Sequence, residues 1–120
     1  MATSTIKYEG WEEISVGKTV NTGTDVTLKA YKKGKMRRLK ITDAYRAANT
    51  SAGSDVLNCT ITGLDGTIDG YWNVPSNYGA NMLVWGIYNE GVSSKLNVRV
   101  LVGSISANTK LNNNIIFMVE

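Results

Sequence analysis

The chain has 120 residues, a formal net charge of +3, a single cysteine and no histidine. Its length suits one domain with one core, and 42% hydrophobic with 19% charged residues is typical of a globular protein. One cysteine excludes a disulfide within the chain. The missing histidine removes the commonest general base and metal ligand, and with it any Ser-His-Asp triad. The charge permits an anionic partner without requiring one.

Residues 1–10 are predicted to be a polar lead-in segment, and residues 11–120 a single domain. The first residues lack the apolar stretch of a secretory signal, and no window is long enough to span a membrane. We therefore expect a soluble protein that is made in the cytoplasm without a signal peptide and does not insert into a membrane.

A short strand is expected near residues 12–17, with Trp11 anchored against the core. The clearest hairpin follows it, because residues 24–31 and 36–42 both alternate apolar and polar side chains around a turn at 32–35. The side chains predicted to face inward are Val26, Leu28, Ala30, Leu39 and Ile41. The adjoining residues 43–48 contain good helix formers, and we expect one helical turn there.

Two more alternating segments follow, at 55–62 and 82–88. Leu57, Cys59 and Ile61 lie on the face of the first that we expect to be buried, and Leu83, Trp85 and Ile87 share one face of the second. Residues 96–102 return as the partner of 82–88. The apolar run 115–119 is predicted to be a central strand that is buried on both faces. About seven to nine short strands joined by glycine and asparagine turns indicate an all-β fold, an antiparallel β-sandwich or jelly roll.

Asp65 and Asp69 lie four residues apart in a glycine-rich loop. Two carboxylates could serve a glycosidase or bind calcium, but this segment offers too few oxygen ligands at alternate positions for a calcium loop. Turn-forming aspartates before Gly66 and Gly70 are the favoured interpretation. We expect no enzyme activity, no catalytic residue, no metal and no cofactor.

A basic run surrounds the predicted hairpin and comprises Lys29, Lys32, Lys33, Lys35, Arg37, Arg38, Lys40 and Arg46. Lysines on an edge hairpin protect a sheet from edge-to-edge aggregation, which is the favoured interpretation. Two alternatives stay open. One is a polyanion-binding surface at Lys32, Lys33, Lys35 and Arg37, and the other is a basic ribbon that binds nucleic acid.

An aromatic cluster follows the glycine-rich loop. Tyr71 and Trp72 could stack on sugar rings, whereas alternation assigns Trp85 to the core or to a subunit interface. Whether Trp72 is exposed or buried is left open. From their clustering in this loop, we assign Asp69, Tyr71, Trp72 and Asn73 as candidate saccharide-binding residues.

The order of these features resembles the C-terminal head domain of receptor-binding proteins from tailed-phage tail fibres and baseplates. The segments that carry the resemblance are Trp11, the 26–35 hairpin, Val74-Pro75-Ser76-Asn77-Tyr78, Leu83-Val84-Trp85-Gly86, Asn97-Val98-Arg99-Val100 and Gly103-Ser104-Ile105. One departure is Gly79, which stands where a second proline often follows the aromatic residue.

The resemblance implies a trimeric head in the virion that binds a polysaccharide of the host cell surface and attaches to other tail or baseplate proteins. A trimer axis would also bury the heavy apolar load of 82–88 and 115–119. Three alternatives remain: a structural tail-assembly module without glycan binding, a nucleic-acid-binding β protein, and a lectin of cellular origin.

Overall fold

The structure is a computed structural model that describes residues 7–8 and 10–120. Most of the predicted lead-in segment, residues 1–6 and 9, lies outside the described residues. No described residue lies in a helix, so none of them forms a membrane-spanning helix. The strands, in chain order, are β1 (Lys7–Tyr8), β2 (Trp11–Ile14), β3 (Gly17–Thr22), β4 (Asp25–Lys33), β5 (Met36–Tyr45), β6 (Thr50–Ser51), β7 (Asp55–Thr62), β8 (Trp72–Tyr78), β9 (Asn81–Glu90), β10 (Ser93–Val102), β11 (Ser104–Ile105) and β12 (Leu111–Met118).

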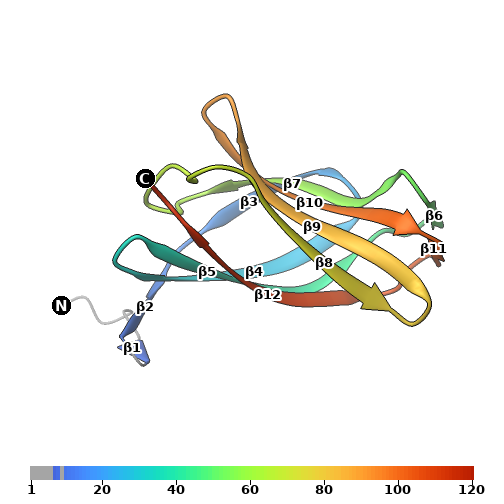
Figure 1. Ribbon diagram of the computed structural model, residues 1–120, viewed down its shortest axis with the longest axis horizontal. Helices are drawn as coiled ribbons and strands as arrows, with labels where there is room; N and C mark the ends of the chain where they lie inside the picture. The colour runs from blue at the N-terminus through green and yellow to red at the C-terminus, as the bar shows by residue number, and fades with distance from the viewer. Residues whose placement is uncertain (1–6, 9) are drawn as a thin grey trace.

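Two five-stranded antiparallel sheets face each other across the core, as Figure 1 shows. The strand order is β1-β2-β4-β5-β12 in the first, called sheet A here, and β3-β7-β10-β9-β8 in the second, called sheet B. Strands β6 and β11 form a separate two-stranded ladder. The predicted all-β, antiparallel sandwich is therefore confirmed.

The β4–β5 hairpin forms as its alternation predicts. Val26, Ala30, Leu39 and Ile41 are buried between the sheets, and Gly34 turns the chain with a φ of 59°. Each large aliphatic side chain removed from water contributes about 1.5–3 kcal/mol. The inward side of this hairpin is therefore a major part of the core.

Sheet B contains a Greek-key arrangement, because the consecutive strands β8, β9 and β10 lie side by side and β7 returns to pair with β10. The residues predicted to share one face of β7 and one face of β9 are all buried, namely Leu57, Cys59, Ile61, Leu83, Trp85 and Ile87. Of the core and the subunit interface, Trp85 therefore lies in the core. The indole N–H of Trp85 donates to the Ser76 hydroxyl at 2.8 Å, which satisfies its polar atom in the core.

The helical turn predicted at 43–48 is wrong. Strand β5 continues to Tyr45, and Asp43 takes a left-handed φ of 54° beside an irregularity in the β5–β12 ladder. The Asp43 backbone N–H donates to the side-chain oxygen of Asn112 at 2.8 Å. Pairing of Ala44 with β12 and of Tyr45 with β4 thus overrides the helix propensity of these residues, since a single turn is weak without packing.

The prediction for 115–119 is also wrong. Strand β12 is an edge strand that pairs only with β5. Ile115 and Phe117 face the core, while Ile116 points outward and is 46% exposed. The continuous apolar run reflects two apolar outward positions, Ile116 and Met118, and not burial on both faces.

Candidate functional site

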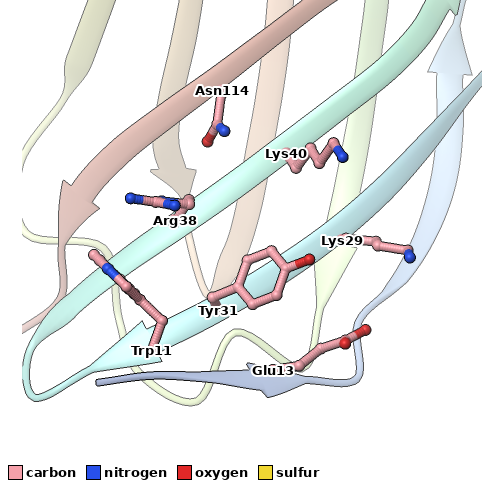
Figure 2. Close-up of a pocket in the computed structure, with 7 residues that line it drawn as sticks. All are labelled: Trp11, Glu13, Lys29, Tyr31, Arg38, Lys40 and Asn114. Atoms are coloured by element: carbon pink, nitrogen blue, oxygen red, sulfur yellow. The ribbon is translucent and has the colours of Figure 1, made fainter. Parts of the chain in front are cut away.

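A hollow of about 380 Å³ lies on the outer face of sheet A, and we call it the sheet A hollow. Strands β2, β4, β5 and β12 contribute its lining, which consists of Trp11, Glu13, Lys29, Tyr31, Arg38, Lys40 and Asn114. Figure 2 shows Tyr31 near the middle, with Trp11 and Arg38 to one side and Lys29 and Glu13 to the other.

The strand register explains why these side chains meet. Tyr31 of β4 lies opposite Glu13 of β2 on one side and Arg38 of β5 on the other. In the next outward row, Lys29 lies opposite Lys40, which in turn lies opposite Asn114 of β12. Because alternate residues of a strand share a face, all of these positions point away from the core.

Trp11 is buried, with 7% of its surface exposed, yet it is absent from the core cluster between the sheets. Its ring lies under Arg38, whose guanidinium carbon is 4.7 Å from the ring centroid. The expectation that Trp11 anchors the core is therefore wrong. Trp11 instead supports a cation on the outer face, a contact worth about 0.5–2 kcal/mol.

The hollow gathers cations without carboxylate partners. Among the described side chains, no ion pair involves Lys29, Arg38 or Lys40, whereas Lys18, Lys32, Lys95 and Arg99 each have one. The Nε atom of Arg38 is buried and has no hydrogen-bond partner. Like charges directly opposite each other, as Lys29 and Lys40 are, destabilise a sheet.

Of the residues predicted for a polyanion surface, Lys32, Lys33, Lys35 and Arg37, the structure contradicts the placement of one. Lys32 pairs with Asp65 at 2.7 Å, and Lys33 and Lys35 are exposed. Arg37 is only 4% exposed, so its placement on the surface is wrong. Its guanidinium donates to backbone carbonyls of Gly34, Met36, Leu64 and Asp65.

The signal that could have placed Arg37 was present in the sequence. Arg37 shares the two-residue alternation of Leu39 and Ile41, which were correctly assigned to the inward face. Its charge is accommodated because a guanidinium is a planar donor that can serve several carbonyls at once. Arg37 therefore ties the β4–β5 turn to the 64–65 segment.

The predicted saccharide residues are found around sheet B, away from the hollow. Trp72 is half-buried and packs against the core, and its indole N–H donates to the Asp69 carbonyl at 2.7 Å. Tyr71 is 58% exposed and stacks on Tyr88 at 4.6 Å between centroids. Asp69 and Asn73 are exposed. Tyr71 is therefore the better placed of the two aromatic residues for an external contact.

Gly86 makes room for the Tyr71 ring. A Cβ atom at Gly86 would lie 3.2 Å from the Tyr71 hydroxyl oxygen. Burial, and then the neighbouring Tyr88, raise the pKa of Tyr71 above its ordinary value. Tyr88 is itself held by Asn58, whose amide donates to its hydroxyl at 3.3 Å.

The Asp65 and Asp69 loop is built from turns. Asp65, Gly66 and Gly70 all have positive φ, and the hydrogen bond and charge of Lys32 lower the pKa of the Asp65 carboxyl. Within the described residues, no group of three or more histidine, cysteine, aspartate or glutamate side chains is placed to hold a metal ion.

In comparisons of the chain with protein-family models, curated proteins and solved structures, no match was found. The resemblance to phage head domains therefore stays a prediction.

Proposed function

We propose that the protein is a non-enzymatic head domain of a tailed-phage tail fibre or baseplate that binds a saccharide of the host cell surface. The observation that supports this most is the sheet A hollow. It combines the ring of Tyr31 with the hydrogen-bonding groups of Arg38 and Asn114 on one rigid sheet. Aromatic surface with a few polar groups is the usual composition of a small-ligand site.

Binding is favoured over hydrolysis by the lining of the hollow. Glu13 is the single carboxylate among the residues that line it. Most glycosidases need two carboxyl groups, one on each side of the scissile bond. The proposal is therefore one of recognition alone.

A trimer is part of this proposal, together with attachment to other tail or baseplate proteins in the virion. Several apolar side chains remain exposed on sheet B, including Tyr78, Met82, Leu101 and Val102. Met82 and Val102 are paired across β9 and β10, so they form a continuous apolar strip. Contact between copies would bury it, and mass measurement in solution tests this.

The decisive binding experiment compares two tyrosines on opposite faces of the sandwich. A glycan array and a whole-cell adsorption assay are run with the wild type, Tyr31→Ala and Tyr71→Ala. We expect Tyr31→Ala to lose roughly tenfold or more in affinity, as binding hot spots do, and Tyr71→Ala to bind like the wild type. The reverse result would return the binding site to the 69–73 loop. Thermal denaturation controls for folding.

The second candidate is a structural assembly module that binds only virion proteins. The exposed apolar strip of Met82 and Val102 is the observation in its favour. If the wild type binds no glycan and no cell surface yet forms a stable trimer, this candidate replaces the first.

A further inference from the structure

We propose that the sheet A hollow selects an acidic saccharide and that Arg38 binds the carboxylate or phosphate group of the sugar. This inference rests on the proposed function and adds the chemical class of the ligand. Three cations line the hollow, namely Lys29, Arg38 and Lys40, together with a single acidic residue, Glu13. The hollow therefore carries a local excess of positive charge.

The first argument is that two of these cations, Lys29 and Lys40, do not serve the fold. Strand β5 pairs with β4 on one side and β12 on the other, so Lys40 protects no free edge. Lys29 and Lys40 lie directly opposite each other, and like charges in this arrangement destabilise a sheet. A bound anion would relieve this repulsion. The chain thus maintains an unfavourable charge arrangement that no carboxylate of the described residues compensates.

The second argument concerns Arg38. Its guanidinium lies against the Trp11 ring, and none of the described residues accepts a hydrogen bond from it. The buried Nε–H is left unsatisfied, which destabilises the fold, and the two terminal nitrogens remain for a ligand. Guanidinium groups bind carboxylates and phosphates through two parallel hydrogen bonds. Because the ring restrains the side chain, less entropy is lost when an acid binds.

The third argument is the spacing of Tyr31 and Arg38. They are directly opposite residues of β4 and β5, so their Cβ atoms lie roughly 4.5–5.5 Å apart. One sugar residue is wide enough to place its C–H face on the Tyr31 ring and its acidic group on Arg38. Lys40 and Asn114, in the adjoining row, lie where a second acidic residue of the same polymer would follow.

The test includes one pair of ligands that differ only in charge, together with two polymers of different chemistry. The probes are polygalacturonate, the same polymer with its carboxylates methyl-esterified, a glycerol-phosphate teichoic acid, and double-stranded DNA. Binding is measured by biolayer interferometry at low and high salt. We expect polygalacturonate or the teichoic acid to bind, which distinguishes carboxylate from phosphate ligands. The esterified polymer should bind at least about tenfold more weakly, and high salt should weaken the acidic ligands.

Matched variants locate the binding. Arg38→Gln removes the charge while keeping much of the side-chain length, and Lys35→Gln removes one charge from an exposed lysine outside the hollow. We expect Arg38→Gln to lose about tenfold or more and Lys35→Gln to stay near wild type. Arg38→Lys keeps the charge but loses the planar fork, and should lie between them. Equal melting temperatures would show that the variants remain folded.

Other results would overturn the inference in distinguishable ways. Equal binding of the acidic and esterified polymers would remove the acidic-ligand inference and leave saccharide binding intact. Equal losses in Arg38→Gln and Lys35→Gln would show diffuse attraction and no site in the hollow. Binding of DNA tighter than of any polysaccharide would replace the inference with nucleic-acid recognition. No binding of any of the four probes would overturn the inference, whereas the glycan array and the whole-cell adsorption assay decide whether the proposed function stands.

Discussion

The outer faces of the two sheets carry similar charged and aromatic residues, but their cations differ in whether they have partners within the chain. On sheet B, Arg99 is 3.0 Å from the Asp55 carboxylate, and Lys95 donates to the Thr60 hydroxyl at 2.9 Å. On sheet A, the described side chains offer Arg38 and Lys40 no such partner. Both faces also contain tyrosines. The two faces differ in whether their cationic side chains have hydrogen-bond or ion-pair partners within the chain.

The comparison teaches that composition alone does not decide whether charged side chains find partners within the fold. Cations that find carboxylates or hydroxyls within the fold contribute modestly to stability. Cations that are brought together without partners cost stability and keep their hydrogen-bonding capacity for a ligand. Strand register decides between these outcomes, because it sets which side chains lie opposite one another.

The largest expected effect separates two adjacent arginines of β5. Arg37 points inward and hydrogen-bonds four carbonyls, whereas Arg38 points outward. Arg37→Gln should lower the free energy of unfolding by about 3 kcal/mol, because it leaves buried acceptors without their donors. Arg38→Gln should change it by less than about 1 kcal/mol. Urea denaturation measures both, and similar losses in the two variants would contradict the assigned orientations.

The next largest effect is expected from a substitution that leaves a cation of sheet B without its carboxylate partner, as on sheet A. Asp55→Asn removes the carboxylate that pairs with Arg99, at nearly constant size. We expect a loss of about 1 kcal/mol in stability, since the pair is partly exposed, and unchanged saccharide binding. Thermal denaturation measures the change in stability, and the polymer-binding assay measures the affinity for saccharide. Weaker polymer binding in this variant would place part of the ligand site on sheet B.

A smaller effect is expected from a substitution that gives a cation of sheet A a carboxylate partner, as on sheet B. Lys40→Glu gives Lys29 an opposite charge directly across the ladder. The free energy of unfolding should rise by about 0.5 kcal/mol, while the affinity for acidic polymers falls. Stability and affinity thus move in opposite directions. A variant that loses both would indicate that Lys40 has a structural role.

The smallest effect tests the tyrosine stack of sheet B. Burial is the main cause of the raised pKa of Tyr71, and Tyr88 adds to it. Tyr88→Phe should therefore lower the pKa of Tyr71 part of the way to its ordinary value. Alkaline titration followed by NMR measures the change. An unchanged pKa would indicate that the two rings do not lie together in solution.

Much of the fold could be predicted because its signals are local. The β4–β5 hairpin and the buried faces of β7 and β9 follow from alternation that is visible within eight or ten residues. The errors arose where the deciding partner is remote. Residues 43–45 extend β5 because Ala44 pairs with Leu111 of β12 and Tyr45 pairs with Asp25 of β4. Trp11 leaves the core because Arg38 covers it from a different strand.

The candidate site was the least predictable feature for the same reason. Its residues come from four strands, and the register between β2 and β4 or between β5 and β12 is not encoded in any single segment. Tyr71, Trp72 and Asp69 were predicted to form a site because they lie close together in the sequence. Sequence proximity identified a loop, whereas the hollow depends on long-range pairing.

The late position of β12 in the chain has a consequence for biosynthesis. Its ladder with β5 closes one side of sheet A and covers core residues with Ile115 and Phe117. A ribosome releases β5 long before β12, so the apolar side of the hairpin must wait for its last partner during translation. Pairing between strands that lie far apart in the sequence slows folding. Until the pairing forms, apolar surface stays exposed to solvent. Nascent chains that stall between β5 and β12 should therefore be clients for molecular chaperones.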